Sequence, residues 1–244
     1  MKKIVIITLS IILAAALGFI FWASSAAGPD AVALTSLESS SEVDVYQLPG
    51  VIVMMPPGNL PETGVIFYPG ARVDYRSYAP LMRDISQAGY FTALVKMPLN
   101  LAIFSPNRAG DIIWSYPQIK TWVLAGHSLG GAMAADFAGK NPEKVNGLAL
   151  WAAYPASSND LSGSKLRVIS IYGTQDGLAM AEKIDASRPL LPTETAWIEI
   201  KGGNHAQFGA YGAQAGDKKA EITLQEQHSQ IVNAMLEWLA GFQQ

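Results

Sequence analysis

The sequence contains no cysteine among its 244 residues, and this absence excludes several classes of protein at once. Without thiols there is no disulfide scaffold, no thiolate zinc site, no iron–sulfur cluster and no cysteine nucleophile. Charge is also sparse, because 17 basic and 20 acidic side chains give a net charge of −3, unlike the basic patches of nucleic-acid-binding domains. A hydrophobic content of 50% excludes a disordered chain. The length is sufficient for a large core.

Charge is missing altogether from residues 4–29, near the N-terminus. The strongly apolar part, residues 4–23, is about as long as a helix that spans a bilayer. This length favours a retained membrane anchor. A removed signal peptide would instead use the small residues Ser25 and Ala27 as its cleavage site before Gly28. The sequence supports both interpretations.

The N-terminal lysines, Lys2 and Lys3, stay on the cytoplasmic side in either case, because positive charge flanks the inner end of such segments. The rest of the chain is therefore expected outside the cytoplasm, either on a single anchor in the cell membrane or in secreted or periplasmic form. We assign residues 1–27 to the anchor or signal peptide, 28–41 to a tether of small and polar residues, and 42–244 to one folded domain.

Short β-rich runs alternate with helical patterns in the rest of the chain. The expected strands are residues 42–47, 51–55, 65–68, 91–96, 121–125, 147–151, 168–172 and 195–200. The expected helices are residues 78–88, 109–116, 129–140, 177–187 and 225–242. Several strands are apolar on both faces, which predicts a mostly parallel sheet covered by helices on both sides. The alternation therefore predicts an α/β fold built as a three-layer sandwich.

The strongest chemical signal is the run Gly126-His127-Ser128-Leu129-Gly130, which matches G-x-S-x-G. It lies between an expected strand and an expected helix, as a nucleophile elbow requires. A sharp strand-to-helix turn holds the serine in a strained backbone conformation, and the flanking glycines leave room for it. The hydroxyl then lies near a helix N-terminus, where a developing anion is favoured. We therefore expect Ser128 to be a nucleophile.

A serine nucleophile needs a general base, and the chain has only three histidines. His127 lies inside the elbow, where the turn that exposes the serine should point its neighbour elsewhere. His228 lies among polar residues of the C-terminal helix, where a solvated face is expected. His205 follows the last expected strand on a loop at the carboxyl end of the sheet. Elimination and placement therefore predict His205 as the general base.

The base in turn needs a carboxylate that orients its ring. Asp176 follows the expected strand 168–172 at the same end of the sheet, and the order Ser128, Asp176, His205 suits a nucleophile elbow. Asp160 lies in a loop rich in Ser and Asn, which is typical of a turn, and Asp185 lies inside an expected helix. The sequence therefore predicts Asp176 as the third member.

An acyl-transfer site also needs donors for the oxyanion. The N–H of Leu129, directly after the nucleophile, is the first candidate. The second is expected from the loop after the strand at 65–68, where Gly70 lets the backbone turn in closely, and Ala71 is the preferred donor. Arg72 could attract an anionic substrate group or form a surface ion pair with a nearby aspartate.

At these positions the chain resembles the α/β-hydrolase superfamily, and in particular small bacterial members related to the dienelactone hydrolases. The resemblance rests on Tyr68-Pro69-Gly70-Ala71, the elbow, Tyr172-Gly173-Thr174-Gln175-Asp176-Gly177 and Gly202-Gly203-Asn204-His205. It implies an eight-stranded, mostly parallel sheet and a hydrolase without a cofactor. Dienelactone hydrolases proper use a cysteine nucleophile, which this chain lacks, so lactone chemistry is not implied. The 16 residues between Trp151 and Val168 are too few for the lid domain of many relatives.

The sequence thus predicts a serine hydrolase that cleaves carboxylic ester or related acyl bonds through an acyl-enzyme. No metal and no cofactor is expected, and the partner is a small-molecule ester or acyl substrate rather than a nucleic acid. The N-terminal segment adds the membrane as a partner if it is not cleaved. Candidate substrate contacts are Arg72, Trp151, Tyr154 and Phe208. The alternatives are an acyltransferase with the same triad and a non-catalytic, membrane-tethered binding module of the same fold.

Overall fold

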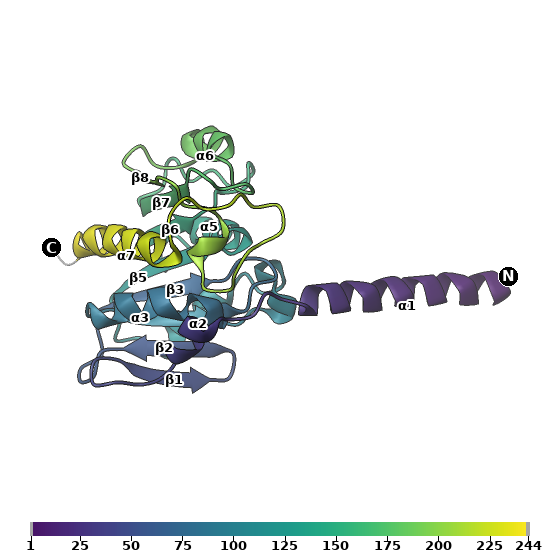
Figure 1. Cartoon of the computed structure of the whole chain (residues 1–244), viewed down its shortest axis with the longest axis horizontal. Helices are drawn as coiled ribbons and strands as arrows, with labels where there is room; N and C mark the ends of the chain where they lie inside the picture. Colours follow the sequence, from purple (N-terminus) through teal and green to yellow (C-terminus); the bar gives the residue numbers. More distant parts are fainter. Residues whose placement is uncertain (1, 243–244) are drawn as a thin grey trace.

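The computed structural model describes residues 2–242 and is built around one eight-stranded sheet (Figure 1). The strand order is β1-β2-β4-β3-β5-β6-β7-β8. Only β2 runs antiparallel to its neighbours, and every other pair in the sheet is parallel. The strands are β1 (Asp44–Leu48), β2 (Val51–Met55), β3 (Thr63–Tyr68), β4 (Phe91–Val95), β5 (Thr121–His127), β6 (Gly147–Trp151), β7 (Arg167–Gly173) and β8 (Ala196–Ile200). The expected mostly parallel sheet is confirmed.

Helices cover both faces of the sheet, because successive side chains of the central strands point to opposite sides and are apolar on both. In β3, Val65 and Phe67 belong to one core, whereas Ile66 and Tyr68 belong to the other. The first core also includes residues of α3 (Ala79–Gln87), α6 (Ala181–Ser187) and α7 (Leu224–Ala240), and the second those of α4 (Arg108–Ser115) and α5 (Leu129–Lys140). The three-layer α/β sandwich is therefore confirmed.

The connection between β6 and β7 has no lid domain. Residues 152–166 form only turns and irregular chain, with no helix or strand. The absence of a lid domain agrees with the short spacing in the sequence.

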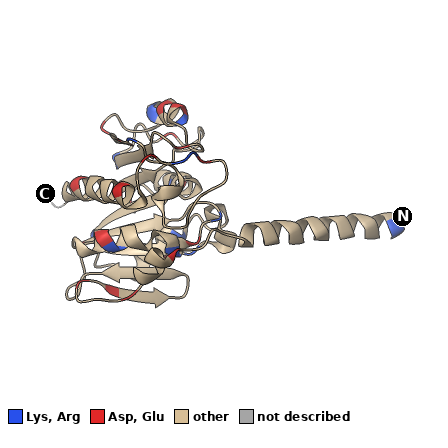
Figure 2. Ribbon diagram, in the orientation of Figure 1, with Lys and Arg blue, Asp and Glu red and all other residues tan. Residues whose placement is uncertain are grey.

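The N-terminal helix α1 (Lys2–Ser24) projects away from the domain (Figure 1). It carries no charged residue between Lys3 and the domain (Figure 2). The most apolar 18-residue stretch within residues 3–24 has a mean hydropathy of 2.9, and none of it is buried against the protein. Its length and composition are compatible with a membrane span, and an N-terminal signal sequence has the same properties.

The segment expected to be a tether is packed on the domain instead. Residues 31–35 form a short helix, α2 (Ala31–Thr35), whose first turn is capped by the Asp30 carboxylate accepting from the N–H of Ala33 at 2.9 Å. Ala33 and Leu37 are buried in contact with the domain. A five-residue helix is too short to produce a periodic pattern, so the composition alone suggested a flexible segment.

Candidate active site

Ser128 stands at a sharp turn between β5 and α5. Its backbone has φ 53° and ψ −124°, a conformation that costs a side-chain-bearing residue free energy and is held here by the surrounding structure. The N–H of Ser128 donates to the carbonyl of Trp151 at 3.0 Å, and its own carbonyl accepts from Ala132 at 3.1 Å. A Cβ on Gly130 would overlap the carbonyl oxygen of Tyr68. The glycine is therefore required for the elbow to sit against the end of β3.

His205 and Asp176 form a buried pair on the loops that follow β8 and β7. Nδ1 of His205 lies 2.8 Å from Oδ2 of Asp176, and both side chains are almost completely excluded from solvent. The other carboxylate oxygen of Asp176 accepts hydrogen bonds from the N–H groups of Leu178 (2.8 Å) and Ala179 (2.6 Å). These backbone donors hold the carboxylate in one orientation, so that it can hold the imidazole.

A cavity of about 280 Å³ brings the elbow and the histidine together. Ser128 and His205 both line it, and Nε2 of His205 has no hydrogen-bond partner within residues 2–242. Of the predicted site residues, Leu129 and Tyr154 also line this cavity. The remaining wall is formed by small or aliphatic residues, namely Ala132, Ala152, Ala153, Leu178 and Ala179.

The loop after β3 lies beside the elbow, because β3 and β5 are paired with Tyr68 opposite Gly126. The N–H of Gly70 donates to the hydroxyl of Tyr78 at 3.0 Å, and that of Arg72 donates to the carbonyl of Asn100 at 2.8 Å. Across residues 2–242, no hydrogen bond uses the N–H of Ala71. Of these three neighbouring N–H groups, only that of Ala71, the predicted oxyanion donor, has no hydrogen-bond partner among residues 2–242.

Three of the predicted substrate contacts lie elsewhere. Trp151 is completely buried, and its indole N–H faces the sulfur of Met235, so only its backbone carbonyl reaches the elbow. Phe208 is also completely buried and stacks on the ring of His127. Arg72 donates to backbone carbonyls at the end of α1 rather than facing the cavity. Trp151 and Phe208 pack in the protein core. A large aromatic residue near a strand end can lie either in the core or in a cavity wall, and the sequence does not distinguish the two.

His127 contributes to the site in a way that sequence reasoning missed. Its ring lies 4.4 Å from the ring of His205, centroid to centroid, and its Nδ1 lies 2.8 Å from the hydroxyl of Tyr78. Complete burial, together with the neighbouring His205, holds the pKa of His127 well below its ordinary value. A neutral His127 therefore packs behind His205. The position directly before the nucleophile was the only sequence signal for this role.

The expectation that His228 is solvated was wrong. It is only 9% exposed, because the first turns of α7 pack over the loops that follow β8. Burial lowers the pKa of His228 to about 4, so the side chain is neutral at pH 7. Among residues 2–242, no group of three or more His, Asp or Glu side chains is arranged to hold a metal ion.

Solved structures with the same fold include hydrolases and esterases. A dienelactone hydrolase from Anabaena variabilis ATCC 29413 superposes with a TM-score of 0.63 at 17% identity, over 82% of this chain and 98% of that one. Est1E from Butyrivibrio proteoclasticus, solved with ferulic acid, gives 0.60 at 13% identity over 81% and 96%. The esterase domain of a Rhodothermus marinus protein gives 0.59 at 10% identity over 80% and 97%. At these identities the likeness shows the fold.

A comparison with curated proteins gave no match. A family model described as the alpha/beta hydrolase family matches residues 64–229, which is most of the domain. This range contains the elbow, Asp176 and His205, and the sheet and the absent lid agree with it. The chain therefore belongs to the alpha/beta hydrolase family.

Proposed function

We propose that the protein is a serine hydrolase that cleaves carboxylic ester bonds through Ser128, His205 and Asp176. The observation that carries this proposal is the cavity that Ser128 and His205 both line. Ser128 has a strained backbone conformation, and Nδ1 of His205 is held by the buried carboxylate of Asp176. Each member arrives from a different strand end, and only the fold brings them together. This arrangement supports the roles of nucleophile for Ser128, general base for His205 and orienting group for Asp176.

In the first half of the reaction, Oγ of Ser128 attacks the ester carbonyl carbon while Nε2 of His205 takes the hydroxyl proton. Asp176 keeps the proton of His205 on Nδ1 and stabilises the imidazolium that forms. The N–H groups of Leu129 and Ala71 bind the oxyanion of the tetrahedral intermediate. The alcohol then leaves with the proton from His205, and an acyl-serine remains.

In the second half, water attacks the acyl carbon while His205 accepts its proton. The carboxylic acid departs, and the proton returns to Oγ of Ser128. The overall reaction is ester plus water giving acid plus alcohol. The small side chains in the cavity wall leave room for an acyl group beside Ser128.

The test is covalent labelling by a fluorophosphonate, which reacts with an activated serine. The wild type should be labelled, whereas Ser128→Ala and His205→Gln should not, and mass spectrometry should place the adduct on Ser128. Equal labelling of the wild type and Ser128→Ala would contradict the proposal. Release of free acid from an ester panel, with added alcohol and amine acceptors, separates hydrolysis from acyl transfer.

We also infer that α1 is a retained anchor. The last turn of α1 and the residues that follow it are integrated into the domain: Ala23 is completely buried, and Ala27 forms a β-bridge with Val73 beside the oxyanion loop. Cleavage before Gly28 would remove these contacts. N-terminal sequencing of the mature protein tests this, because a mature chain that begins at Gly28 would contradict a retained anchor.

A further inference from the structure

The helix α1 leaves the domain at the same edge of the sheet that carries the candidate active site. Ser128 follows β5 and the oxyanion loop follows β3, so both lie at the carboxyl edge of the parallel strands. The end of α1 contacts this loop through Arg72, one residue beyond Ala71. Figure 1 shows α1 extending outward from this end of the domain.

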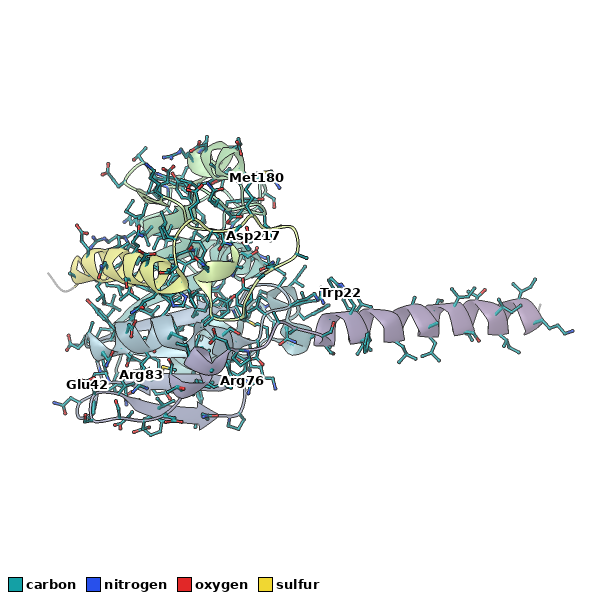
Figure 3. All side chains as sticks on the ribbon, viewed as in Figure 1. Trp22, Glu42, Arg76, Arg83, Met180 and Asp217 are labelled. Carbon is teal, nitrogen blue, oxygen red and sulfur yellow. The ribbon has the colours of Figure 1, made fainter. Side chains whose placement is uncertain are left out.

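The junction between α1 and the domain is fixed by several contacts and contains no free linker. Nε of Arg72 donates to the carbonyl of Trp22 at 3.0 Å, and a terminal nitrogen donates to the carbonyl of Ser25 at 2.9 Å. The guanidinium also lies over the indole ring of Trp22, 4.6 Å from its centroid. Trp22 lies where α1 meets the domain (Figure 3). Because Ala27 already pairs with Val73, the domain cannot rotate freely about α1.

Apolar surface continues from α1 onto the loop that follows β4. Ile103 and Phe104, in a short 3₁₀ helix (Ala102–Phe104), are 56% and 51% exposed. The ring of Phe104 meets the ring of Phe19 edge to face, with 6.2 Å between centroids. Exposed apolar side chains beside a membrane-type helix, with a tryptophan at its end, are typical of a protein surface at a lipid–water boundary.

A cavity of about 420 Å³ lies at the same junction, between Ser24 at the end of α1 and the loop after β4. Two cationic side chains, Lys96 and Arg108, line it, and Arg108 also pairs with Asp111 at 3.3 Å, so the net positive charge of the recess comes mainly from Lys96. Phosphate oxygens of lipid headgroups lie at this depth when a helix of this length spans the hydrocarbon core. The positive charge of the recess is therefore complementary to the phosphate of a lipid headgroup. The neighbouring apolar side chains of Ile103 and Phe104 would contact the lipid acyl chains near the headgroups.

We propose that this edge of the domain lies against the lipid surface, and that the substrate is the ester of an amphiphile embedded in the bilayer. The proposal rests on the proposed ester hydrolysis and on the retained anchor. Ester groups of membrane amphiphiles lie at the boundary between headgroups and hydrocarbon, which is the level of the junction. The released acid and alcohol return to the bilayer or to water according to their hydrophobicity. A long flexible tether would allow the domain to take any orientation relative to the membrane. The contacts between α1 and the domain instead hold it in one orientation.

Because the chain has no cysteine, one introduced thiol can carry a probe at a chosen position. We would label Ile103→Cys in the full chain reconstituted in phosphatidylcholine vesicles, which leaves the contact of Phe104 with α1 intact. Trp114→Cys is the matched control, since Trp114 is 84% exposed on α4, next to the amino end of β5 at the opposite edge. Nitroxide-bearing lipids should quench the probe at 103 at least several-fold more than the probe at 114. Equal quenching would overturn the proposed orientation.

The substrate class is tested in the same vesicles with two esters, a water-soluble short-chain ester and a fluorogenic ester lipid. A twelve-residue Gly-Ser insertion after Ser24 adds a reach of about 20 Å and frees the domain from α1. It should lower hydrolysis of the bilayer ester about tenfold and leave the soluble ester unchanged. The same insertion after the exposed Gly163, at the opposite edge, should change neither rate.

The outcomes separate the two proposals. If the wild type hydrolyses neither ester and resists the fluorophosphonate, the proposed function fails. If it hydrolyses the soluble ester but not the bilayer ester, or if the insertion after Ser24 leaves the bilayer rate unchanged, the proposed substrate class fails while the hydrolase proposal stands. A short-chain preference that is unaffected by vesicles would favour a soluble or peptide-borne ester instead.

Discussion

The hydroxyl of Tyr78 lies 2.8 Å from Nδ1 of His127 and accepts a hydrogen bond from the N–H of Gly70. A hydrogen bond donated by the Tyr78 hydroxyl to Nδ1 would place the proton of the neutral His127 ring on Nε2. One buried side chain thus joins the residue before Ser128 to the loop that carries Ala71. This link fixes the distance between the two halves of the proposed oxyanion site.

Replacing Tyr78 by Phe should therefore weaken catalysis as well as stability. The change leaves the N–H of Gly70 and Nδ1 of His127 without a partner, which should lower the free energy of unfolding by about 1–3 kcal/mol. It should lower kcat more than it raises KM, because oxyanion contacts form in the transition state. Urea unfolding and steady-state ester hydrolysis measure the two effects. Tyr90→Phe is the matched control, since Tyr90 is buried and no side-chain hydrogen bond uses its hydroxyl within the described residues. Equal kinetics of both variants would contradict the prediction.

Asp176→Asn should retain the fold and lose most of the activity. The amide carbonyl can still accept from Leu178 and Ala179, so the loop keeps its conformation. An amide facing Nδ1 favours the wrong tautomer of His205 and cannot stabilise the imidazolium, so kcat should fall by about 10³–10⁴. Circular dichroism and ester hydrolysis test this. Asp160→Asn, which alters an exposed loop carboxylate, should keep wild-type kcat.

Replacing Ser128 by glycine should stabilise the folded protein, because glycine adopts the backbone conformation at this position without strain. Relief of the backbone strain should raise the free energy of unfolding by about 1–3 kcal/mol. The greater conformational freedom of glycine in the unfolded chain should reduce this gain by about 1 kcal/mol or less. We expect Ser128→Gly to unfold at higher urea than Ser128→Ala, with both variants inactive. A more stable alanine variant would show that φ 53° carries no strain here.

Gly130→Ala should prevent the elbow from forming. Its Cβ would overlap the carbonyl oxygens of Tyr68 and Pro69, which are backbone atoms of a central strand end and cannot move aside cheaply. We expect poor yield of folded protein and no fluorophosphonate labelling. Gly163→Ala is the control, because that glycine has open space around it and ordinary φ, and the variant should behave as the wild type.

Stability should fall between pH 7.5 and 4.5 because His228 is buried in its neutral form. Its pKa is about 4 in the folded chain and about 6.5 when unfolded, so between these values only the unfolded chain binds the proton. The free energy of unfolding therefore decreases as the pH falls through this window, by up to about 3 kcal/mol from this group. Urea unfolding at both pH values, with His228→Gln for comparison, isolates the contribution. An equal pH effect in the variant would rule it out.

The order of strands and helices could be predicted from the sequence because each element depends on local patterns. Apolar runs such as 122–125 are recognisable without knowing their neighbours, and the chain order of the elements then implies a parallel sheet. The short helix α2 escaped prediction because five residues show no periodicity. The buried positions of Gln227 and His228 also escaped it, since their burial depends on the loop that α7 covers.

The sequence by itself determined the nucleophile that the proposal uses, because the chain has no cysteine and the G-x-S-x-G turn is a local steric requirement. It also determined that one N-terminal stretch is apolar enough to span a bilayer. Only the tertiary structure decided what Arg72 contacts, that Tyr78 reaches His127, and that α1 joins the edge carrying Ser128. Arg72 and Trp22 are 50 residues apart in the chain, and Tyr78 and His127 are 49 apart. Their contacts depend on strand pairing and packing, which no local pattern encodes.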